Sequence, residues 1–258
     1  MRLAILFAAA LACQAQNTLT PRERAQGWIL LFDGKSLDAW EDPRANTPPG
    51  DSWSVEDGCI KSAARPKLRQ DLISRQSYGD FDLAFDWRIA PKGNSGVKYR
   101  IQDRVWVYRV PGISKFERLV DHALANRRPP QAGQGEEYGI AFEYQVIDYH
   151  GDPQSPSAAG ALYELIGPSR AAARPVGEFN QARIVVKGNH IEHWLNGSKV
   201  VDAELTAPEI AAGLARRWST ESPVYRMLTG QPRRNCPIAL QNHNSEAWFR
   251  NIRIRPLR

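Results

Sequence analysis

The segment DFDLAFDWRI, residues 80–89, constrains the fold more than any other part of the chain. Its apolar residues occupy alternate positions: Phe81, Leu83, Phe85, Trp87 and Ile89. Because successive side chains of a β-strand point to opposite faces of a sheet, this period of two predicts a strand with one buried face. The same alternation predicts further strands at 96–102, 140–148, 160–166, 182–188 and 190–196, with shorter ones at 28–32, 53–61 and 71–74.

Turn residues separate these strands. Asn196-Gly197, between two apolar segments, is a strong signal for a tight hairpin. Two helices are expected, one at 114–127 with a capping box formed by Ser114 and Glu117, and one at 206–218 with Thr206 as its N-cap. Many strands with little helix between them predict an all-β antiparallel sandwich or jelly roll.

The first sixteen residues, MRLAILFAAALACQAQ, have the pattern of a signal peptide. The apolar run is too short to span a bilayer, so no membrane span is expected. A secreted or periplasmic protein is predicted, and Cys13 is the lipidated residue in the alternative of a lipoprotein. Residues 17–258 are expected to form one domain, in which residues 103–137 form an insertion lying over the sandwich.

The composition is that of an ordinary globular protein, with 42% hydrophobic and 24% charged residues. A net charge of +6 raises the question of nucleic acid, but the basic residues are scattered and not interleaved with aromatic ones, so no nucleic-acid partner is expected. For Cys59 and Cys236, an exported protein leaves both a disulfide and two free thiols open. No Cys-x-x-Cys pair indicates a zinc site.

Two side chains of one expected strand are candidates for chemistry. In AFEYQVID, residues 141–148, Glu143 and Gln145 share the face opposite the apolar residues, and Asp148 ends the strand. Arg100 is expected on the polar face of another strand. If the two polar faces belong to one concave sheet, Glu143, Gln145 and Arg100 meet in a cleft. A solvated outer face is the alternative. Hydrolysis by paired carboxylates is not supported, because the strand carries no second carboxylate beside Glu143.

The segment LQNHNSEAWFRNIRI, residues 240–254, is expected to be the last strand. It is rich in Asn, which strands usually avoid, so its polar residues are candidates for the wall of a site. Gln241 and His243 point to one side, whereas Asn242 and Asn244 are expected to be turn residues. His243 is the best acid/base candidate near neutral pH. Motifs for serine hydrolases, phosphate loops and zinc peptidases are missing from the sequence.

Six segments in order resemble one family. They are GWILLFDGKSLDAW, GNSGVKYR, FEYQVID, GALYELI, GEFNQARIVVKGNHIEHWLNG and IALQNHNSEAWFRNIRI. Together they are similar to the 3-keto-disaccharide hydrolase family, also described as 3-keto-glucoside 1,2-lyase/3-keto-2-hydroxy-glucal hydratase domains. The resemblance covers about residues 27–257 and is interrupted at 103–137 and at about 207–235. It implies a concanavalin-A-like lectin/glucanase jelly roll that acts on oxidised glucosides.

The resemblance also implies a mechanism. A ketone at C3 acidifies the proton on C2, so that a base removes it, the group on C1 leaves, and water adds to the product. We expect His243 or Glu143 to be the base, Arg100 to stabilise the enolate, and Asp148 to assist or to bind a divalent cation, the one candidate cofactor. The residues expected to hold sugar hydroxyls are Asn94, Gln145, Tyr163 and Gln241. A sugar 3-oxidase is the expected upstream partner.

Two other interpretations use the same fold. The chain is then either a carbohydrate-binding module without catalysis or a structural surface protein without a cleft. For the binding module, the candidate stacking platforms are Trp53, Trp87, Trp106, Trp194, Trp218 and Trp248.

Overall fold

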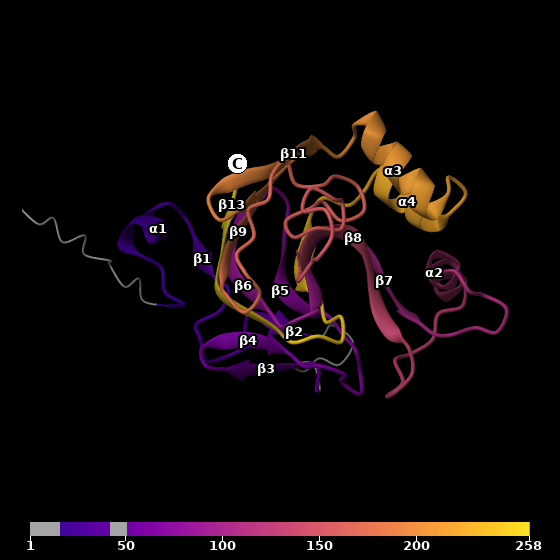
Figure 1. Cartoon of the computed structure of the whole chain (residues 1–258), viewed down its shortest axis with the longest axis horizontal. Helices are drawn as coiled ribbons and strands as arrows, with labels where there is room; N and C mark the ends of the chain where they lie inside the picture. The colour runs from indigo at the N-terminus through magenta and orange to yellow at the C-terminus, as the bar shows by residue number, and fades with distance from the viewer. Residues whose placement is uncertain (1–15, 42–50, 258) are drawn as a thin grey trace, which may run out of the picture.

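The computed structural model describes residues 16–41 and 51–257. Two antiparallel sheets pack face to face, which confirms the predicted all-β jelly-roll sandwich (Figure 1). The predicted signal peptide, including Cys13, lies outside the described residues except for Gln16. Within the described residues, no helix is long and apolar enough to cross a membrane.

The larger sheet has eight strands. In spatial order they are β11 (Ser198–Glu204), β10 (His190–Leu195), β9 (Asn180–Lys187), β6 (Phe81–Ile89), β13 (Ala247–Pro256), β4 (Cys59–Ser62) and β3 (Trp53–Glu56), with β1 (Ile29–Leu30) paired to β13. The smaller sheet has the order β2 (Trp40–Glu41), β5 (Leu72–Tyr78), β12 (Cys236–Leu240), β7 (Asn94–Val107) and β8 (Glu136–Ile147).

The alternating residues of β6 all lie in the core between the sheets, as the period of two predicts. Phe142, Tyr144 and Val146 of β8 face the same core, which leaves Glu143 and Gln145 on the outer face of the smaller sheet. The sequence pattern therefore places the polar residues of β8 correctly. Cys59 and Cys236 are buried free thiols.

The polar segment 240–254 is not one strand, contrary to the expectation. Leu240 ends β12 in the smaller sheet, and Ala247 begins β13 in the larger sheet. Residues 241–246 therefore cross from one sheet to the other. The Asn-rich composition of this segment is that of a loop, and its position over the end of the smaller sheet brings it to the candidate site.

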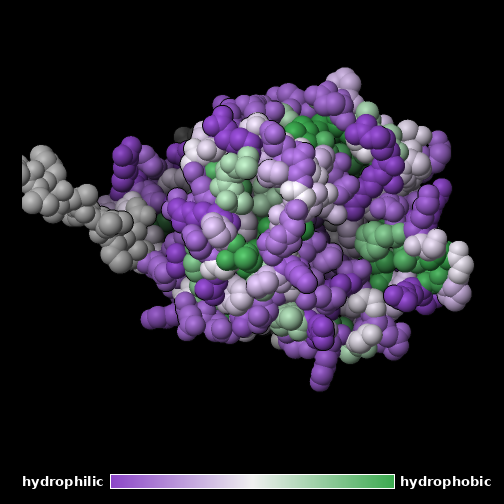
Figure 2. Space-filling model, in the orientation of Figure 1, coloured by the Kyte–Doolittle hydropathy of each residue, from purple (hydrophilic) through white to green (hydrophobic). Residues whose placement is uncertain are grey.

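The helices lie beside the β7/β8 hairpin, apart from α1 (Pro21–Ala25) (Figure 1). They are α2 (Phe116–Ala125), α3 (Pro208–Trp218) and α4 (Pro223–Thr229). Figure 2 shows hydrophobic residues gathered over α2, which projects from the body of the sandwich. Two predicted caps are wrong: Lys115 and Ala207 occupy the N-cap positions of α2 and α3, and neither makes a side-chain capping bond. The expected strand at 160–166 is a series of turns with isolated bridges at Leu162, and its backbone is bonded to Glu143 and Gln145 of β8.

A buried histidine joins the two sheets inside the core. The Tyr99 hydroxyl lies 2.9 Å from Nε2 of His193, and the Gly160 carbonyl oxygen lies 3.0 Å from Nδ1. Because the carbonyl only accepts, Nδ1 carries the proton, and Nε2 accepts from Tyr99. Burial lowers the pKa of His193 to about 4.

This histidine predicts acid sensitivity. Its folded pKa of about 4 is below the ordinary value of 6.5, so the unfolded chain binds the proton more tightly. The contribution of His193 to the free energy of unfolding is constant above pH 6.5. It falls by about 3 kcal/mol in total as the pH drops from 6.5 to 4. Urea unfolding at pH 7, 5.5 and 4 measures this slope, and His193→Gln is expected to make it shallower. An unchanged slope in the variant would show that other groups cause the acid sensitivity.

Candidate active site

A cleft of about 310 Å³ lies on the outer face of the smaller sheet. Its lining includes six of the eight site residues predicted from the sequence, namely Asn94, Glu143, Gln145, Tyr163, Gln241 and His243. The sequence did not single out the other lining residues as site residues: Phe116, Glu117, Glu136, Glu137, Tyr138, Arg217 and Asn242. Strands β7 and β8, the loop after β12 and helices α2 and α3 therefore build one site.

Glu143 is the carboxylate of this cleft with the most perturbed environment. Burial raises its pKa to about 7, although the positive charges of Lys98 and Arg217 act in the opposite direction. The other lining carboxylates each form an ion pair with an arginine: Glu117 with Arg217, Glu136 with Arg69, and Glu137 with Arg104. Within the described residues, Glu143 forms no such ion pair. Its carboxyl group is thus available to gain or lose a proton near neutral pH.

Lys98 faces Glu143 across the β7/β8 ladder and is buried. Its ammonium Nζ donates to Oδ2 of Asp71 at 2.7 Å. Burial alone would lower the pKa of Lys98, but the negative charges of Asp71 and Glu143 outweigh burial and raise it. A permanent positive charge therefore lies beneath the cleft beside Glu143.

Amide side chains line the cleft next to Glu143. In the amide orientation that satisfies its neighbours, Nε2 of Gln145 donates to the Ser95 carbonyl at 3.1 Å and to Oε1 of Glu143 at 3.3 Å. The buried atoms Asn94 Oδ1 and Gln241 Oε1 have no hydrogen-bond partner among the described residues. Buried polar atoms normally have partners, so these two amides are suited to bind hydroxyl groups of a ligand.

The loop that carries His243 is held by hydrogen bonds on both sides. The Gln241 N–H donates to the Gly96 carbonyl at 2.8 Å, and the Asn242 N–H donates to Oδ1 of Asp71 at 3.2 Å. The Asn242 side chain accepts from the Asn244 N–H at 2.9 Å, which shapes the turn. His243 lies exposed at the cleft, and its pKa is below the usual value, mainly because surrounding protein atoms displace water from part of the ring.

A glycine makes room for Glu143. A Cβ atom built on Gly96 would lie 2.7 Å from Cδ and 2.8 Å from Cγ of Glu143, too close for real atoms. We expect Gly96→Ala to displace the carboxyl group of Glu143 while the fold is retained. For a shift of 1 Å, kcat of a reaction that uses this carboxyl group is expected to fall by up to about 100-fold. Gly79→Ala is the matched control, because a Cβ atom there meets nothing within 4 Å. Steady-state rates of both variants test the prediction, and an equal effect of the two would contradict it.

Two segments far apart in the sequence cover the cleft. Arg217 of α3 lies 3.6 Å from Glu117 of α2, and its guanidinium lies 5.1 Å from the ring centre of Tyr163. The Tyr163 N–H is bonded to the Glu143 carbonyl at 3.0 Å, so this tyrosine is fixed to β8. Arg217 is thus a cation of the site that strand patterns did not reveal. The one signal for it was its place in the Arg216-Arg217 pair on an expected helix.

Arg100 does not line this cleft. Three residues of β7, 100–102, lie opposite Ala141 alone, and Arg100 has a φ of 55°. This bulge turns its side chain toward the other sheet, where its guanidinium donates to the Gly188 carbonyl at 2.8 Å and to Asp80 at 3.3 Å. The structure therefore separates Arg100 from the residues it was expected to join.

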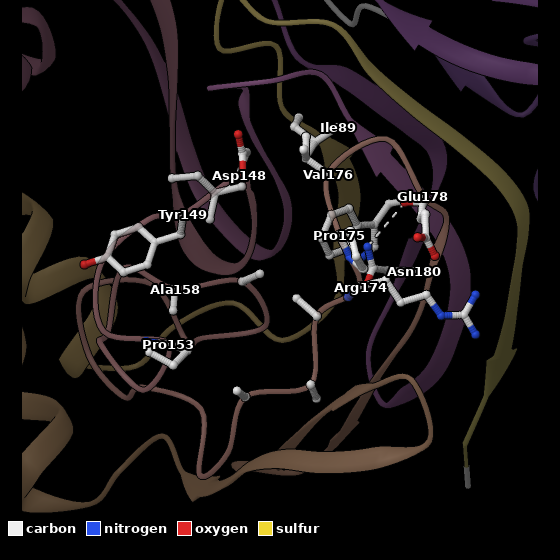
Figure 3. A pocket seen from close by; sticks show the side chains of 16 residues that line it. Ile89, Asp148, Tyr149, Pro153, Ala158, Arg174, Pro175, Val176, Glu178 and Asn180 are labelled. Atoms are coloured by element: carbon white, nitrogen blue, oxygen red, sulfur yellow. Dashed lines mark hydrogen bonds between the residues drawn. The ribbon is translucent and has the colours of Figure 1, made fainter.

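Asp148 also lies outside the cleft. Its Oδ2 accepts from the Lys92 N–H at 2.7 Å and lies 3.1 Å from Nε2 of His150. It lines a separate cavity of about 380 Å³, with Asp148 and Tyr149 on one side and Arg174 and Glu178 on the other (Figure 3). The Asp148 carboxylate is thus engaged by the Lys92 N–H and by His150.

The candidate divalent cation has no matching donor set among the described residues of the cleft, because arginines pair with three of its carboxylates. Across the described residues, one group brings three metal-binding side chains together: His190, Glu192 and Asp202. It lies on β10 and β11 of the other sheet, and Lys199 forms ion pairs with both carboxylates.

The tryptophans do not form an open sugar-stacking surface. Four of the six candidates, Trp53, Trp87, Trp106 and Trp218, are buried. Arg88 covers the Trp248 ring at 4.3 Å, and Arg183 lies 5.6 Å from the Trp194 ring centre. The guanidinium groups of Arg88 and Arg183 thus lie over the rings of the two partly exposed tryptophans.

Known proteins similar to this chain agree with the resemblance seen in the motifs. The relative in Bacteroides thetaiotaomicron called 3-keto-disaccharide hydrolase is 26% identical over an alignment of 272 residues in length. The alignment covers 98% of this chain and 87% of that protein. A crystal structure of a proposed glycosyl hydrolase from Parabacteroides distasonis has a TM-score of 0.69 and 25% identity, covering 95% of this chain and 100% of the other. A second one from that organism has a TM-score of 0.58 and 23% identity, with 89% and 99% covered, and shows the shared fold.

The family model described as the 3-keto-alpha-glucoside-1,2-lyase-like domain matches residues 27–255, which span the whole sandwich. The match confirms the resemblance that the six sequence motifs indicate. The chain belongs to the family of 3-keto-alpha-glucoside-1,2-lyase-like domains.

Proposed function

We propose that this protein cleaves 3-keto-glucosides, including 3-keto-disaccharides, by elimination followed by hydration. The observation that carries the proposal is Glu143, a carboxyl group without an ion-pair partner among the described residues, whose pKa of about 7 suits a general base near neutral pH. Family membership and the name of the Bacteroides relative support the substrate class. An elimination needs one base and no carboxylate nucleophile, in agreement with the single free carboxylate of the cleft.

Glu143 is the base that takes the proton from C2 of the substrate. The electron pair of the C2–H bond forms the enolate, whose negative charge develops on the C3 oxygen. Arg217, the cation that lines the cleft, replaces Arg100 in the role of stabilising this charge, and Lys98 adds its positive charge from beneath. The enolate then expels the group on C1.

His243, in its protonated form, gives a proton to the departing oxygen as the C1–O bond breaks. In the second step, water adds to the C1–C2 double bond: its hydroxyl joins C1, its proton goes to His243, and Glu143 returns its proton to C2. Both residues thereby recover their starting protonation states, and the net reaction is hydrolysis. Asn94, Gln145, Tyr163 and Gln241 bind the sugar hydroxyls; for Asn94 and Gln241, amide oxygens without a partner among the described residues support this role.

The substrate chemistry places the protein after another reaction. A ketone at C3 of a glucoside arises by oxidation of the C3 hydroxyl, so a sugar 3-oxidase is the partner we propose. The N-terminal segment supports export to the periplasm or the medium, where such oxidised sugars would be met.

The test is incubation with a 3-keto-glucoside and with the same glucoside bearing a C3 hydroxyl. We expect release of the leaving group from the keto form alone, and slower release from the keto substrate that carries deuterium at C2, because Glu143 breaks this bond. A parallel reaction with chelator is expected to proceed at the same rate. Equal cleavage of the keto and hydroxyl sugars, or equal rates for the C2-hydrogen and C2-deuterium substrates, would refute the elimination mechanism.

A further inference from the structure

The two segments that interrupt the family motifs meet above the cleft. Helix α2 belongs to the first segment, and helices α3 and α4 belong to the second. The Ser222 hydroxyl, which caps α4, donates to Oδ1 of Asp121 on α2 at 2.6 Å. Arg217 and Glu117 join α3 to α2 in the same region. The inserted helices therefore form one cover.

A second cavity adjoins the cleft beside α3, and its lining residues Arg216 and Glu164 are exposed at the surface. It has a volume of about 390 Å³ and shares Glu117, Tyr163 and Arg217 with the cleft that contains Glu143. Its own lining residues are Glu164, Gly213 and Arg216. The site therefore has two adjoining parts, of which the first holds the proposed base.

The second cavity is lined by charged side chains and carries few apolar groups. Arg216 forms no ion pair or hydrogen bond through its side chain with any other described residue. Its guanidinium folds back toward Gly213, where a Cβ atom would lie 3.6 Å from it. Glu164 is oriented by the Ser157 hydroxyl, which donates to its Oε1 at 2.9 Å. One face of the Tyr163 ring is covered by Arg217, which reduces its value as a stacking platform for an apolar ring.

We infer that this second cavity is the subsite for the leaving group, and that Arg216 and Glu164 select a second sugar ring over an apolar aryl group. The inference rests on the proposed function of the cleft. A sugar offers hydroxyl groups that donate to a carboxylate and accept from a guanidinium, whereas a phenyl ring offers neither. The insertions of this chain thus determine which glycosides it accepts.

The test compares a 3-keto-disaccharide, a phenyl 3-keto-glucoside and a methyl 3-keto-glucoside of the same anomeric configuration. We expect Arg216→Ala to lower kcat/KM for the disaccharide by about tenfold, the loss of one charge-assisted hydrogen bond, through a higher KM. The values for the methyl and phenyl glucosides are expected to stay within about twofold, because neither engages Arg216. Arg226→Ala is the control, since Arg226 is an exposed arginine of α4 outside both cavities.

The outcomes separate the two proposals. An equal loss with all three substrates, or no loss with the disaccharide, would overturn the subsite while leaving the proposed reaction in place. No turnover of any keto-glucoside by the unaltered protein would overturn the proposed function and the subsite with it. A thermal unfolding midpoint equal to that of Arg226→Ala shows that the Arg216 variant is folded.

Discussion

Replacing Glu143 by Gln is expected to lower kcat/KM for 3-keto-glucosides by about 10²- to 10⁴-fold, the usual contribution of a general base. The substitution keeps the size and the hydrogen-bonding capacity of the side chain and removes its ability to take a proton. Burial, the main cause of the raised pKa, also makes the neutral amide easy to accommodate. The fold is therefore expected to survive the change.

The pH profile identifies the residue responsible. Glu143 acts as a base only when ionised, and its pKa is about 7, so kcat/KM is expected to rise as Glu143 loses its proton. The proposed mechanism also needs protonated His243, whose pKa is below the usual value, so kcat/KM is expected to fall again as His243 loses its proton. The rising side of this bell-shaped profile is expected to disappear in Glu143→Gln and the falling side in His243→Ala, and a rising side that persists in Glu143→Gln would contradict the assignment of Glu143 as the base.

His243→Ala is the comparison for this assignment. We expect the variant to retain the rise near pH 7 and to lose most activity on substrates with a poor leaving group, because His243 protonates the departing oxygen. If Glu143→Gln and His243→Ala both turned over the substrate at the full rate, neither residue would be catalytic.

Replacing Asp71 by Asn is expected to destabilise the protein by about 3–5 kcal/mol, the loss usually seen when one partner of a buried ion pair is removed. Lys98 and Asp71 are both buried, and their side chains meet at 2.7 Å. Asn keeps the oxygen that accepts from the Asn242 N–H, so the change removes the charge of the carboxylate to which the Lys98 ammonium is bonded. Urea unfolding at pH 7 measures the loss.

Two further variants show whether the unpaired charge is the cause. Asp71→Asn combined with Lys98→Met is expected to regain most of the lost stability, because the double variant buries no unpaired charge. Glu41→Gln, which breaks the partly exposed ion pair with Arg75, is expected to change stability by less than about 1 kcal/mol. If the double variant were no more stable than Asp71→Asn, the hydrogen bonds of Asp71 would matter more than its charge.

The face of β8 that carries Glu143 and Gln145 was predictable because strand alternation is a local property. The backbone geometry sends neighbouring side chains to opposite faces, and the apolar set Phe142, Tyr144 and Val146 fixes which face is buried. For the same reason the sequence was a sufficient guide to the sandwich itself. The unusual Asn content before β13 likewise made Gln241 and His243 candidates for a site wall and assigned Asn242 and Asn244 to a turn, although not to a loop that crosses between the two sheets.

Strand alternation predicts the position of Arg100 wrongly. Alternation extended along β7 places Arg100 beside Lys98, but a bulge reverses the pattern after Tyr99. Ile101 consequently packs with Ile73 and Ala239 on the outer face, apart from the main core. A bulge depends on the partner strand and on the contacts of the extra residues, here Asp80 and Gly188. No pattern within β7 contains that information.

The sequence by itself thus determined the sandwich, the outward face of Glu143 and Gln145, and the polar character of the segment with His243. Only the tertiary structure decided which cations lie near Glu143 in the cleft. Lys98 is fixed by Asp71, and Arg217 is carried by a helix that meets α2 through Glu117. The physical reason is distance along the chain: alternation acts between neighbouring residues, whereas these charges are brought together by packing between segments that are remote in the sequence.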